Sequence, residues 1–401
     1  MAWIDNLFKM MTEKKASDLH MTSEHVPMIR ESGDMMPLDG VPKLSKDQVK
    51  QILMEIAPDR SKKQFEETWD ADFAYALEGC GRFRCNYFVD RYGPAAVFRR
   101  IPDKILSAEQ LGLPAAVLRL CEFKKGLVLV TGPTGSGKST TLAAMIDAIN
   151  SGRKEHIITI EDPVEFVHPP KKCLVNQREV HQHTKSFAAA LRAALREDPD
   201  IVLVGEMRDL ETTRIAIETA ETGHLVFGTL HTSTASSTVD RIINQFPAEE
   251  QEQIRLMLAG SLRGVVAQNL LKKKGGGRVA AQEILFTTPG IAANIREGKT
   301  YQIPSQMQTG ARYGMQLLND ALEKLVKADT VEPMEAYDRS IDKEDMAKRL
   351  KALGHDVEAA QTLAAANLKA EKTEAAAPPR PAPGAAPAPA QPGSPGWKRP
   401  S

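Results

Sequence analysis

The stretch from Gly126 to Thr141 reads GLVLVTGPTGSGKSTT, and it decides the fold that the sequence predicts. Leu127 to Val130 form an apolar run typical of a buried strand, and apolar residues at helical spacing follow the motif. Between them, residues 132–139 match G-x-x-x-x-G-K-[ST] without a mismatch. A strand, a glycine-rich loop and a helix in this order indicate a phosphate-binding loop. A glycine-rich turn that binds nothing would not need those flanks.

Each part of this loop suits a nucleoside triphosphate. Glycines let the backbone curl so that successive N–H groups point at one spot, and the following helix adds its positive dipole end. Lys138 can neutralise the β- and γ-phosphates, and the Ser139 hydroxyl can ligate a magnesium ion. The predicted phosphate-binding residues are Gly132, Pro133, Thr134, Gly135, Ser136, Gly137, Lys138 and Ser139.

Length and composition limit the function classes. The chain has 401 residues, enough for two or more cores, and its 52 basic and 52 acidic residues cancel. This balance argues against a nucleic-acid binder that depends on phosphate neutralisation, although a local basic groove is compatible with it. The four cysteines show no C-x-x-C pair, and no apolar leader or apolar run of about 20 residues occurs. We therefore expect a cytoplasmic protein with no membrane span.

The chain divides into segments of different pattern. Residues 1–101 combine an amphipathic opening helix with alternating strands, which predicts a small α+β domain; residues 102–124 form a connector. From residue 125 to 286, strands at 127–131, 157–160, 201–205 and 225–230 alternate with helices, which predicts an α/β core with a mostly parallel sheet. After Pro247 the pattern is mainly helical apart from one expected strand at Val279 to Phe286, and residues 287–352 form a helical C-terminal region. Residues 370–401 are rich in alanine and proline and are predicted to be a disordered tail.

Acidic side chains follow two of the predicted parallel strands. Ile201 to Glu206 is an apolar strand that ends in a carboxylate, and Glu206 is the candidate general base for the attacking water. A second cluster, Glu161, Asp162 and Glu165, follows the strand at 157–160 and would lie over the same crevice. The cluster could instead be a solvated turn made by Glu-Asp-Pro.

Two histidines flank the strand Leu225 to Leu230. His224 and His231 would point to opposite faces, so a shared metal ion is not expected. His231, at the carboxyl end, is better placed to sense the γ-phosphate or a neighbouring subunit, and His224 could equally be a structural histidine. A cluster of four arginines on the last strands of the first domain, Arg82, Arg84, Arg99 and Arg100, could supply a guanidinium to a phosphate, although spacing alone favours solvated faces.

Together these segments resemble the ATPases of type II secretion and type IV pilus systems, within them the twitching-motility retraction branch. The resemblance rests on LREDPDIVLVGEMRD (195–209), GPTGSGKST, ITIEDPVEF (158–166) and TGHLVFGTLHT (222–232), and extends from Ser17 to about Leu350. It implies a PAS-like domain followed by a RecA-like ATPase domain, assembled as a homo-hexamer. It also implies nucleotide and magnesium binding by Lys138, Ser139 and Thr140.

The resemblance further implies catalysis by Glu206 and functional roles for the acidic-box residues, both histidines, Arg84 and Arg99. A hexameric motor of this family would hydrolyse ATP with Mg²⁺ to power pilus retraction and twitching motility, and would reach the inner membrane only through a pilus platform protein. The branch's stretch AIRNLIRE reads GIAANIRE at residues 290–297, a departure that bears on coupling to pilus withdrawal and leaves the ATPase site unaffected.

Other functions remain open from the sequence. One is an accessory pilus or type II secretion ATPase of the same family. Another is a nucleic-acid-stimulated translocase on a RecA-like core, which the neutral charge disfavours. A third is a structural ring that binds ATP without turnover, against which the presence of Lys138, Ser139 and Glu206 argues.

Overall fold

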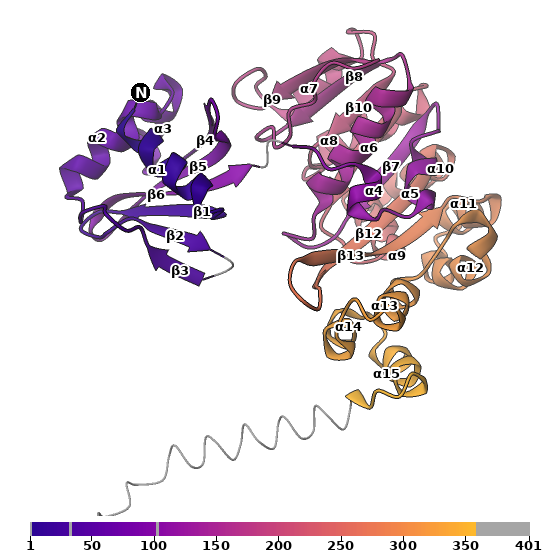
Figure 1. Cartoon of the computed structure of the whole chain (residues 1–401). Coiled ribbons are helices and arrows are strands. Elements are labelled where there is room, and N and C mark those ends of the chain that lie inside the picture. Colours follow the sequence, from indigo (N-terminus) through magenta and orange to yellow (C-terminus); the bar gives the residue numbers. More distant parts are fainter. Residues whose placement is uncertain (1, 32–33, 102–103, 358–401) are drawn as a thin grey trace, which may run out of the picture. The chain divides into compact units, whose positions relative to one another are not determined.

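The computed structural model describes residues 2–31, 34–101 and 104–357, and Figure 1 shows its elements. By their contacts the residues divide into two compact units, Met1–Lys343 and Glu344–Ser401. The predicted alanine- and proline-rich tail, residues 370–401, lies outside the described residues.

The N-terminal residues form an antiparallel sheet of six strands in the order β3-β2-β1-β6-β5-β4. The strands are β1 (Asp18–Thr22), β2 (Met28–Glu31), β3 (Asp34–Pro37), β4 (Ala71–Leu77), β5 (Gly81–Asp90) and β6 (Gly93–Ile101), and the helices are α1 (Trp3–Glu13), α2 (Lys46–Ile56) and α3 (Asp59–Thr68). The opening helix α1 buries its apolar side in this core, where Phe8 stacks on Phe83 with ring centroids 4.0 Å apart. The expected amphipathic helix therefore packs on its own domain.

A second sheet of seven strands carries the phosphate-loop motif. Its order is β13-β12-β7-β11-β10-β8-β9, and every neighbouring pair except β12 and β13 is parallel. The strands are β7 (Gly126–Thr131), β8 (His156–Glu161), β9 (Leu174–Glu179), β10 (Ile201–Val204), β11 (Leu225–Leu230), β12 (Leu262–Lys272) and β13 (Arg278–Phe286). The predicted α/β fold with a mostly parallel sheet is confirmed. The carboxyl ends of β7, β8, β10 and β11 therefore meet at one edge.

Helices cover this sheet, and more helices follow it (Figure 1). Those within the α/β segment are α4 (Ala108–Leu111), α5 (Ala115–Leu120), α6 (Lys138–Gly152), α7 (Phe187–Ala194), α8 (Leu210–Glu221), α9 (Ala235–Ile243) and α10 (Ala248–Ser261). After β13 come α11 (Pro289–Arg296), η1 (Thr300–Gln302), α12 (Ile303–Thr309), η2 (Ala311–Tyr313), α13 (Leu318–Lys327), α14 (Pro333–Arg339) and α15 (Lys343–Ala352).

Strand β12 corrects the sequence prediction, which placed helices between Pro247 and residue 279. Leu262–Lys272 is instead a strand that pairs with β7, the strand leading into the phosphate loop. Both faces of this strand are buried, so its sequence shows no regular alternation of polar and apolar residues. A buried segment without such alternation cannot be distinguished from a buried helix by periodicity. The edge strand β9 was also absent from the predicted strands.

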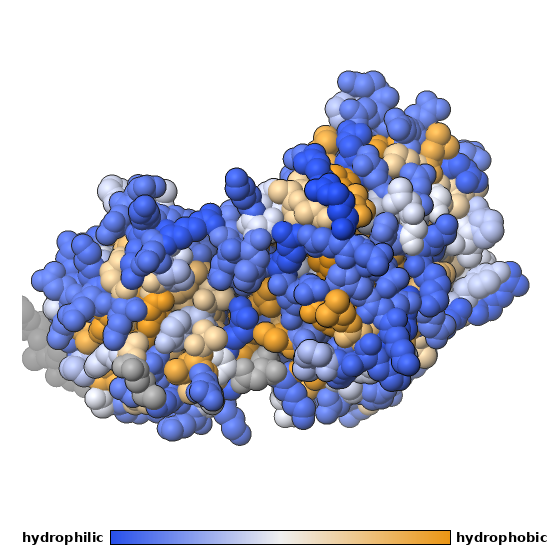
Figure 2. Space-filling view, turned by 90° about the horizontal axis from the view of Figure 1, so that it is seen from above, coloured by the Kyte–Doolittle hydropathy of each residue, from blue (hydrophilic) through white to orange (hydrophobic). Residues whose placement is uncertain are grey.

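The surface in the view of Figure 2 is mainly hydrophilic, and its hydrophobic residues form small, separate patches. Large apolar side chains that are exposed include Trp69, which follows α3, and Tyr301, in η1. Among the helices of the described part of the chain, none is both long and apolar enough to cross a bilayer.

Candidate functional site

The phosphate loop connects β7 to α6 through residues 132–137. Gly137, at the N-cap of α6, has a φ of 86°, and Gly135 has a φ of 78°. A Cβ on Gly132 would lie 2.3 Å from the Gln268 carbonyl oxygen, so only glycine allows this approach to β12. Lys138 donates from Nζ to the carbonyl oxygens of Gly132 at 2.9 Å and Pro133 at 3.2 Å. The lysine ammonium thus lies against the loop that the motif assigns to phosphate.

Glu206 follows β10 at the carboxyl edge of the sheet, and the backbone on both sides of it is fixed. The Gly205 N–H donates to the Ile160 carbonyl at 2.8 Å, and the Met207 N–H donates to the Thr229 carbonyl at 3.1 Å. These bonds continue the pairing with β8 and β11 beyond the strand. The Glu206 side chain, which is 20 % exposed, is therefore presented at a defined position next to the phosphate loop.

Two basic side chains contact the Glu206 carboxylate. His231 Nε2 lies 2.9 Å from Oε1 and Arg208 Nε lies 2.5 Å from the same oxygen. Burial acts to raise the pKa of Glu206, but the hydrogen bond and charge of Arg208, followed by those of His231, outweigh burial and lower it. The carboxylate is therefore kept ionised, which is the state that can accept a proton from water.

The Lys138 ammonium interacts electrostatically with acidic residues of this site. Burial lowers the pKa of its ammonium, and the charges of Glu206 and then Glu165 oppose that effect. The phosphate loop, the strand-end base and one residue of the acidic box therefore form one electrostatic site, as expected for the shared edge of a parallel sheet.

The acidic box separates into three different environments. Glu161 ends β8 and accepts from Thr159 Oγ1 at 2.6 Å and Gln177 Nε2 at 3.2 Å. Burial raises its pKa, and these hydrogen bonds only partly offset that effect. Glu165 is half-buried, and its backbone N–H donates to Glu161 at 3.4 Å. Asp162 is exposed and contributes charge near Arg208.

The residues present suit a magnesium ion. Ser139 and Glu161 both line a small cavity that begins at the phosphate loop and whose other walls include Leu142, Phe166 and Leu203. Hard oxygen donors of this kind, completed by substrate phosphates and water, are what Mg²⁺ takes in nucleotide sites. In the described part of the chain, no three His, Cys, Asp or Glu side chains gather into a metal cluster.

The two histidines lie at opposite ends of the strand β11. His231 is at the carboxyl end of β11, on Glu206. His224 precedes β11, and its backbone carbonyl accepts from the Gly126 N–H at the start of β7. The His224 ring nitrogen Nδ1 is 3.1 Å from the Thr219 carbonyl. Within this chain His224 therefore fastens α8 to β11 at the end of the sheet remote from the phosphate loop.

The candidate arginines lie on the N-terminal sheet. Arg99 donates from Nε to Asp18 at 2.8 Å, and Arg84 Nε lies 3.9 Å from Asp72. Both guanidinium groups are well exposed, at 70 % and 46 %. No contact of either with the phosphate loop occurs in the residues that the structure describes, so any role on phosphate requires them to leave these acids.

Sequence reasoning missed two residues that complete the Glu206 environment. Arg208 contacts the Glu206 carboxylate, and Thr229 donates from Oγ1 to the Gly205 carbonyl at 2.5 Å. Both lie in segments that the sequence analysis had singled out, EMRD and FGTLHT. Arg208 could have been found as a cation two residues after the predicted base, whereas the Thr229 contact follows only from the pairing of β10 with β11.

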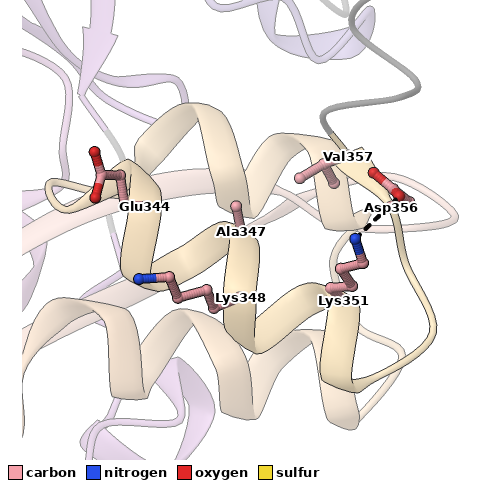
Figure 3. A pocket seen from close by; sticks show the side chains of 6 residues that line it. All are labelled: Glu344, Ala347, Lys348, Lys351, Asp356 and Val357. Carbon is pink, nitrogen blue, oxygen red and sulfur yellow. Dashed lines mark ion pairs between the residues drawn. The ribbon is translucent and has the colours of Figure 1, made fainter.

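A separate hollow on α15 contains none of the predicted site residues (Figure 3). It is lined by Glu344, Ala347, Lys348, Lys351, Asp356 and Val357. An ion pair joins Lys351 and Asp356 at 3.8 Å, and both side chains are largely exposed. Exposed pairs contribute little, and the hollow presents no constellation that would perform chemistry.

Comparison with known proteins identifies the family. The model of the family "Type II/IV secretion system protein" matches residues 1–355. The chain belongs to this family. The family match covers both sheets and all of the site residues described above, which confirms the resemblance found in the sequence motifs.

Several family members are close in sequence and structure. The chain is 54 % identical over 323 residues to the type IV pilus retraction ATPase PilT of Pseudomonas aeruginosa, covering 80 % of this chain and 94 % of that protein. It is 52 % identical over 322 residues to a twitching motility protein of Neisseria gonorrhoeae, covering 80 % and 86 %. A solved structure of the pilus retraction motor PilT with bound ADP matches with a TM-score of 0.80 and 46 % identity, covering 86 % of this chain and 98 % of that one. The predicted recognition as a retraction ATPase is confirmed.

Proposed function

We propose that this chain hydrolyses ATP with Mg²⁺ and that the energy powers retraction of type IV pili and hence twitching motility. The observation that carries the proposal is the ionised Glu206 carboxylate at the strand edge beside a complete phosphate loop, in a chain more than half identical to a retraction ATPase. The loop N–H groups, Lys138 and Thr140 would bind the nucleotide phosphates.

The chain's own residues supply the hydrolytic step. Glu206 accepts a proton from the attacking water, the water oxygen bonds to the γ-phosphorus, and the bond between that phosphorus and the β–γ bridging oxygen breaks. Lys138, which now contacts the Gly132 and Pro133 carbonyls, turns to the phosphates. When bound, Mg²⁺ would neutralise phosphate charge, held by Ser139 and by waters near Glu161. His231 keeps Glu206 in place and senses phosphate release.

The remaining site residues are proposed to act upon closure of the assembly. We infer a homo-hexamer of PAS-like and RecA-like domains in which Arg84 and Arg99 approach a bound nucleotide. The Arg84–Asp72 pair is exposed on both sides, so breaking it costs little, about 0–1 kcal/mol. Arg99 pairs with the buried Asp18 carboxylate, so releasing Arg99 costs more. Asp162 and Glu165 would serve contacts at the same closing interface. The ring would act on an inner-membrane pilus platform protein from the cytoplasmic side.

A strain deleted for this chain tests the function. Retraction predicts abundant surface pili with lost twitching. The parent chain should restore twitching, and Glu206→Gln should not.

An accessory pilus or secretion ATPase is the second candidate, favoured by the altered segment at residues 290–297, where Asn294 is buried with an unpaired amide nitrogen. Retained twitching would support it, and lost surface pili would indicate an assembly role. ATP hydrolysis strongly stimulated by DNA would favour a translocase.

A further inference from the structure

A buried glutamine on β12 contacts the phosphate loop and holds its backbone in place. Gln268 is 2 % exposed, and its Nε2 donates to the Ser136 carbonyl of the loop at 2.6 Å. Thr141, in the first turns of α6, donates from Oγ1 to Gln268 Oε1 at 2.9 Å. Gly132 packs directly on the Gln268 carbonyl oxygen. One residue of β12 therefore contacts the start of the loop, its end and the helix that follows.

The orientation of the Gln268 amide follows from its partners. A backbone carbonyl only accepts hydrogen bonds, so the amide nitrogen must face Ser136. The oxygen then faces Thr141 and also the Nε2 of Gln282, which donates to it at 3.2 Å. Gln282 lies opposite Gln268 in the pairing of β12 with β13 and is equally buried. A displacement of the Ser136 carbonyl would therefore shift the Gln268 amide and, through it, the hydrogen bond to Gln282.

The chain of bonds continues to the segment before α13. Gln316 donates from Nε2 to the Gln282 carbonyl at 2.8 Å, and its backbone pairs with Ile284 through two hydrogen bonds of 2.9 and 3.1 Å. Its Oε1 accepts from Lys324 in α13 at 2.9 Å. We call Gln268, Gln282 and Gln316 the glutamine relay. It runs from the phosphate loop across two strands to a helix that contributes nothing directly to the phosphate site.

The same segment is held from the other face of β13. Glu283 is 5 % exposed and accepts from the Ala235 N–H at 2.8 Å and the Leu318 N–H at 3.3 Å, the first residues of α9 and α13. The Gln282 backbone carbonyl thus holds Gln316, and the Glu283 carboxylate holds the first N–H of α13. The start of α13 is therefore rigidly tied to β13, and a change at the phosphate loop can reach it.

We propose that Gln268 is a positioning residue for the phosphate loop and that the glutamine relay couples the nucleotide state of the loop to α13. The proposal rests on the nucleotide binding proposed above. When phosphate binds and Lys138 leaves the Gly132 and Pro133 carbonyls, the loop adjusts, the Ser136 carbonyl turns with it, and the Gln268 amide transmits the change. Buried amides without alternative partners transmit such changes because breaking a link leaves polar groups unsatisfied.

The test combines ADP binding with hydrogen exchange in the full chain. Gln268→Met keeps size but leaves Ser136 and Thr141 without their partner, and we expect its Kd for fluorescent ADP to rise roughly tenfold. Gln316→Met removes the last member of the relay, at the end that is distant from the phosphate loop. We expect its Kd for ADP to be within about twofold of the parent value. In the parent, ADP should slow exchange in peptides covering residues 316–327, and in Gln316→Met that ADP-dependent change should be lost.

Controls make each outcome decisive. Gln253→Met places the same substitution on an exposed position of α10 and should match the parent in both measurements. Gln268→Asn, which keeps both polar groups but is too short to span Ser136 and Thr141, replaces Gln268→Met if that variant fails to fold. Parent-like ADP binding in the Gln268 variant would overturn the positioning role, and unchanged ADP-dependent exchange in Gln316→Met, or no such change in the parent, would overturn the coupling. A parent that binds no ADP would overturn the proposed nucleotide function as well.

Discussion

The Glu206 carboxylate and the His231 imidazole lie 2.9 Å apart, Oε1 to Nε2, across the carboxyl ends of the adjacent strands β10 and β11. The acid comes from the segment that follows β10 and the imidazole from the segment that follows β11. Because both strands are parallel to β7, the two side chains lie at the edge that carries the phosphate loop.

Glu206→Gln removes the proposed base and keeps its shape. We expect kcat for ATP hydrolysis to fall roughly 100-fold or more, because an amide cannot accept the proton of the attacking water. The Kd for ADP should change little, since the loop and Lys138 are intact. Glu221→Gln, an exposed acid at the end of α8, is the matched control and should hydrolyse as the parent does. A Glu206→Gln chain as active as the parent would refute the assignment.

The pH dependence of hydrolysis should report on Arg208. The pKa of Glu206 is lowered by Arg208 and His231, so its carboxylate stays ionised as pH falls and loses activity only below its usual range. Arg208→Ala removes the larger of these two charges, which raises the Glu206 pKa and moves the acidic limb of kcat/KM to higher pH. Arg241→Ala, at an exposed position of α9, should leave the limb in place. An unshifted limb in Arg208→Ala would show that this pair does not tune the base.

Glu161 should make stability depend on pH. Burial raises its pKa in the folded chain, so above the unfolded pKa only the unfolded state has released the proton, and stability falls as pH rises towards the folded pKa. Glu161→Gln has no proton to release and should lose less of its thermal midpoint over the same rise in pH. Comparing unfolding midpoints of both chains from about pH 4.5 upward checks this. Identical pH profiles would mean that folding does not raise the pKa of Glu161.

Two glycines of the phosphate loop should differ in their tolerance of alanine. Gly132 and Gly135 both have positive φ, at 144° and 78°, so alanine costs backbone strain at each, roughly 1–2 kcal/mol. A Cβ at 132 also meets the Gln268 carbonyl at 2.3 Å and Ser136 Oγ at 2.5 Å, whereas a Cβ at 135 has nothing within 4 Å. We expect Gly132→Ala to lose ADP binding and several degrees of midpoint, and Gly135→Ala to lose markedly less. Equal losses in Gly132→Ala and Gly135→Ala would contradict the close packing of the phosphate loop on β12.

Local pattern was sufficient for the parts of the site that lie within one strand and its following turn. The phosphate loop is encoded by glycine, lysine and serine at fixed spacing, because its geometry is set by its own backbone and by the flanking strand and helix. Glu206 could be found for the same reason, as an acid directly after an apolar strand. The mostly parallel sheet followed from the alternation of strands with helices.

Residues that act through long-range pairing could not be found in this way. Gln268 stands in an apolar run that reads equally as helix or strand, and its contact with Ser136 depends on β12 lying beside β7. Likewise, His224 and His231 look equivalent in sequence, but the direction of β11 puts only His231 on Glu206.

By itself, then, the sequence determined that a triphosphate loop and a strand-end carboxylate exist and belong to a secretion-type ATPase. Only the tertiary structure decided which charges surround Glu206 and that β12 seats the loop through Gln268. The physical reason is that hydrogen-bond partners between strands depend on strand order and register, which bring together residues as far apart as Ser136 and Gln268 and leave no periodic trace in the local sequence.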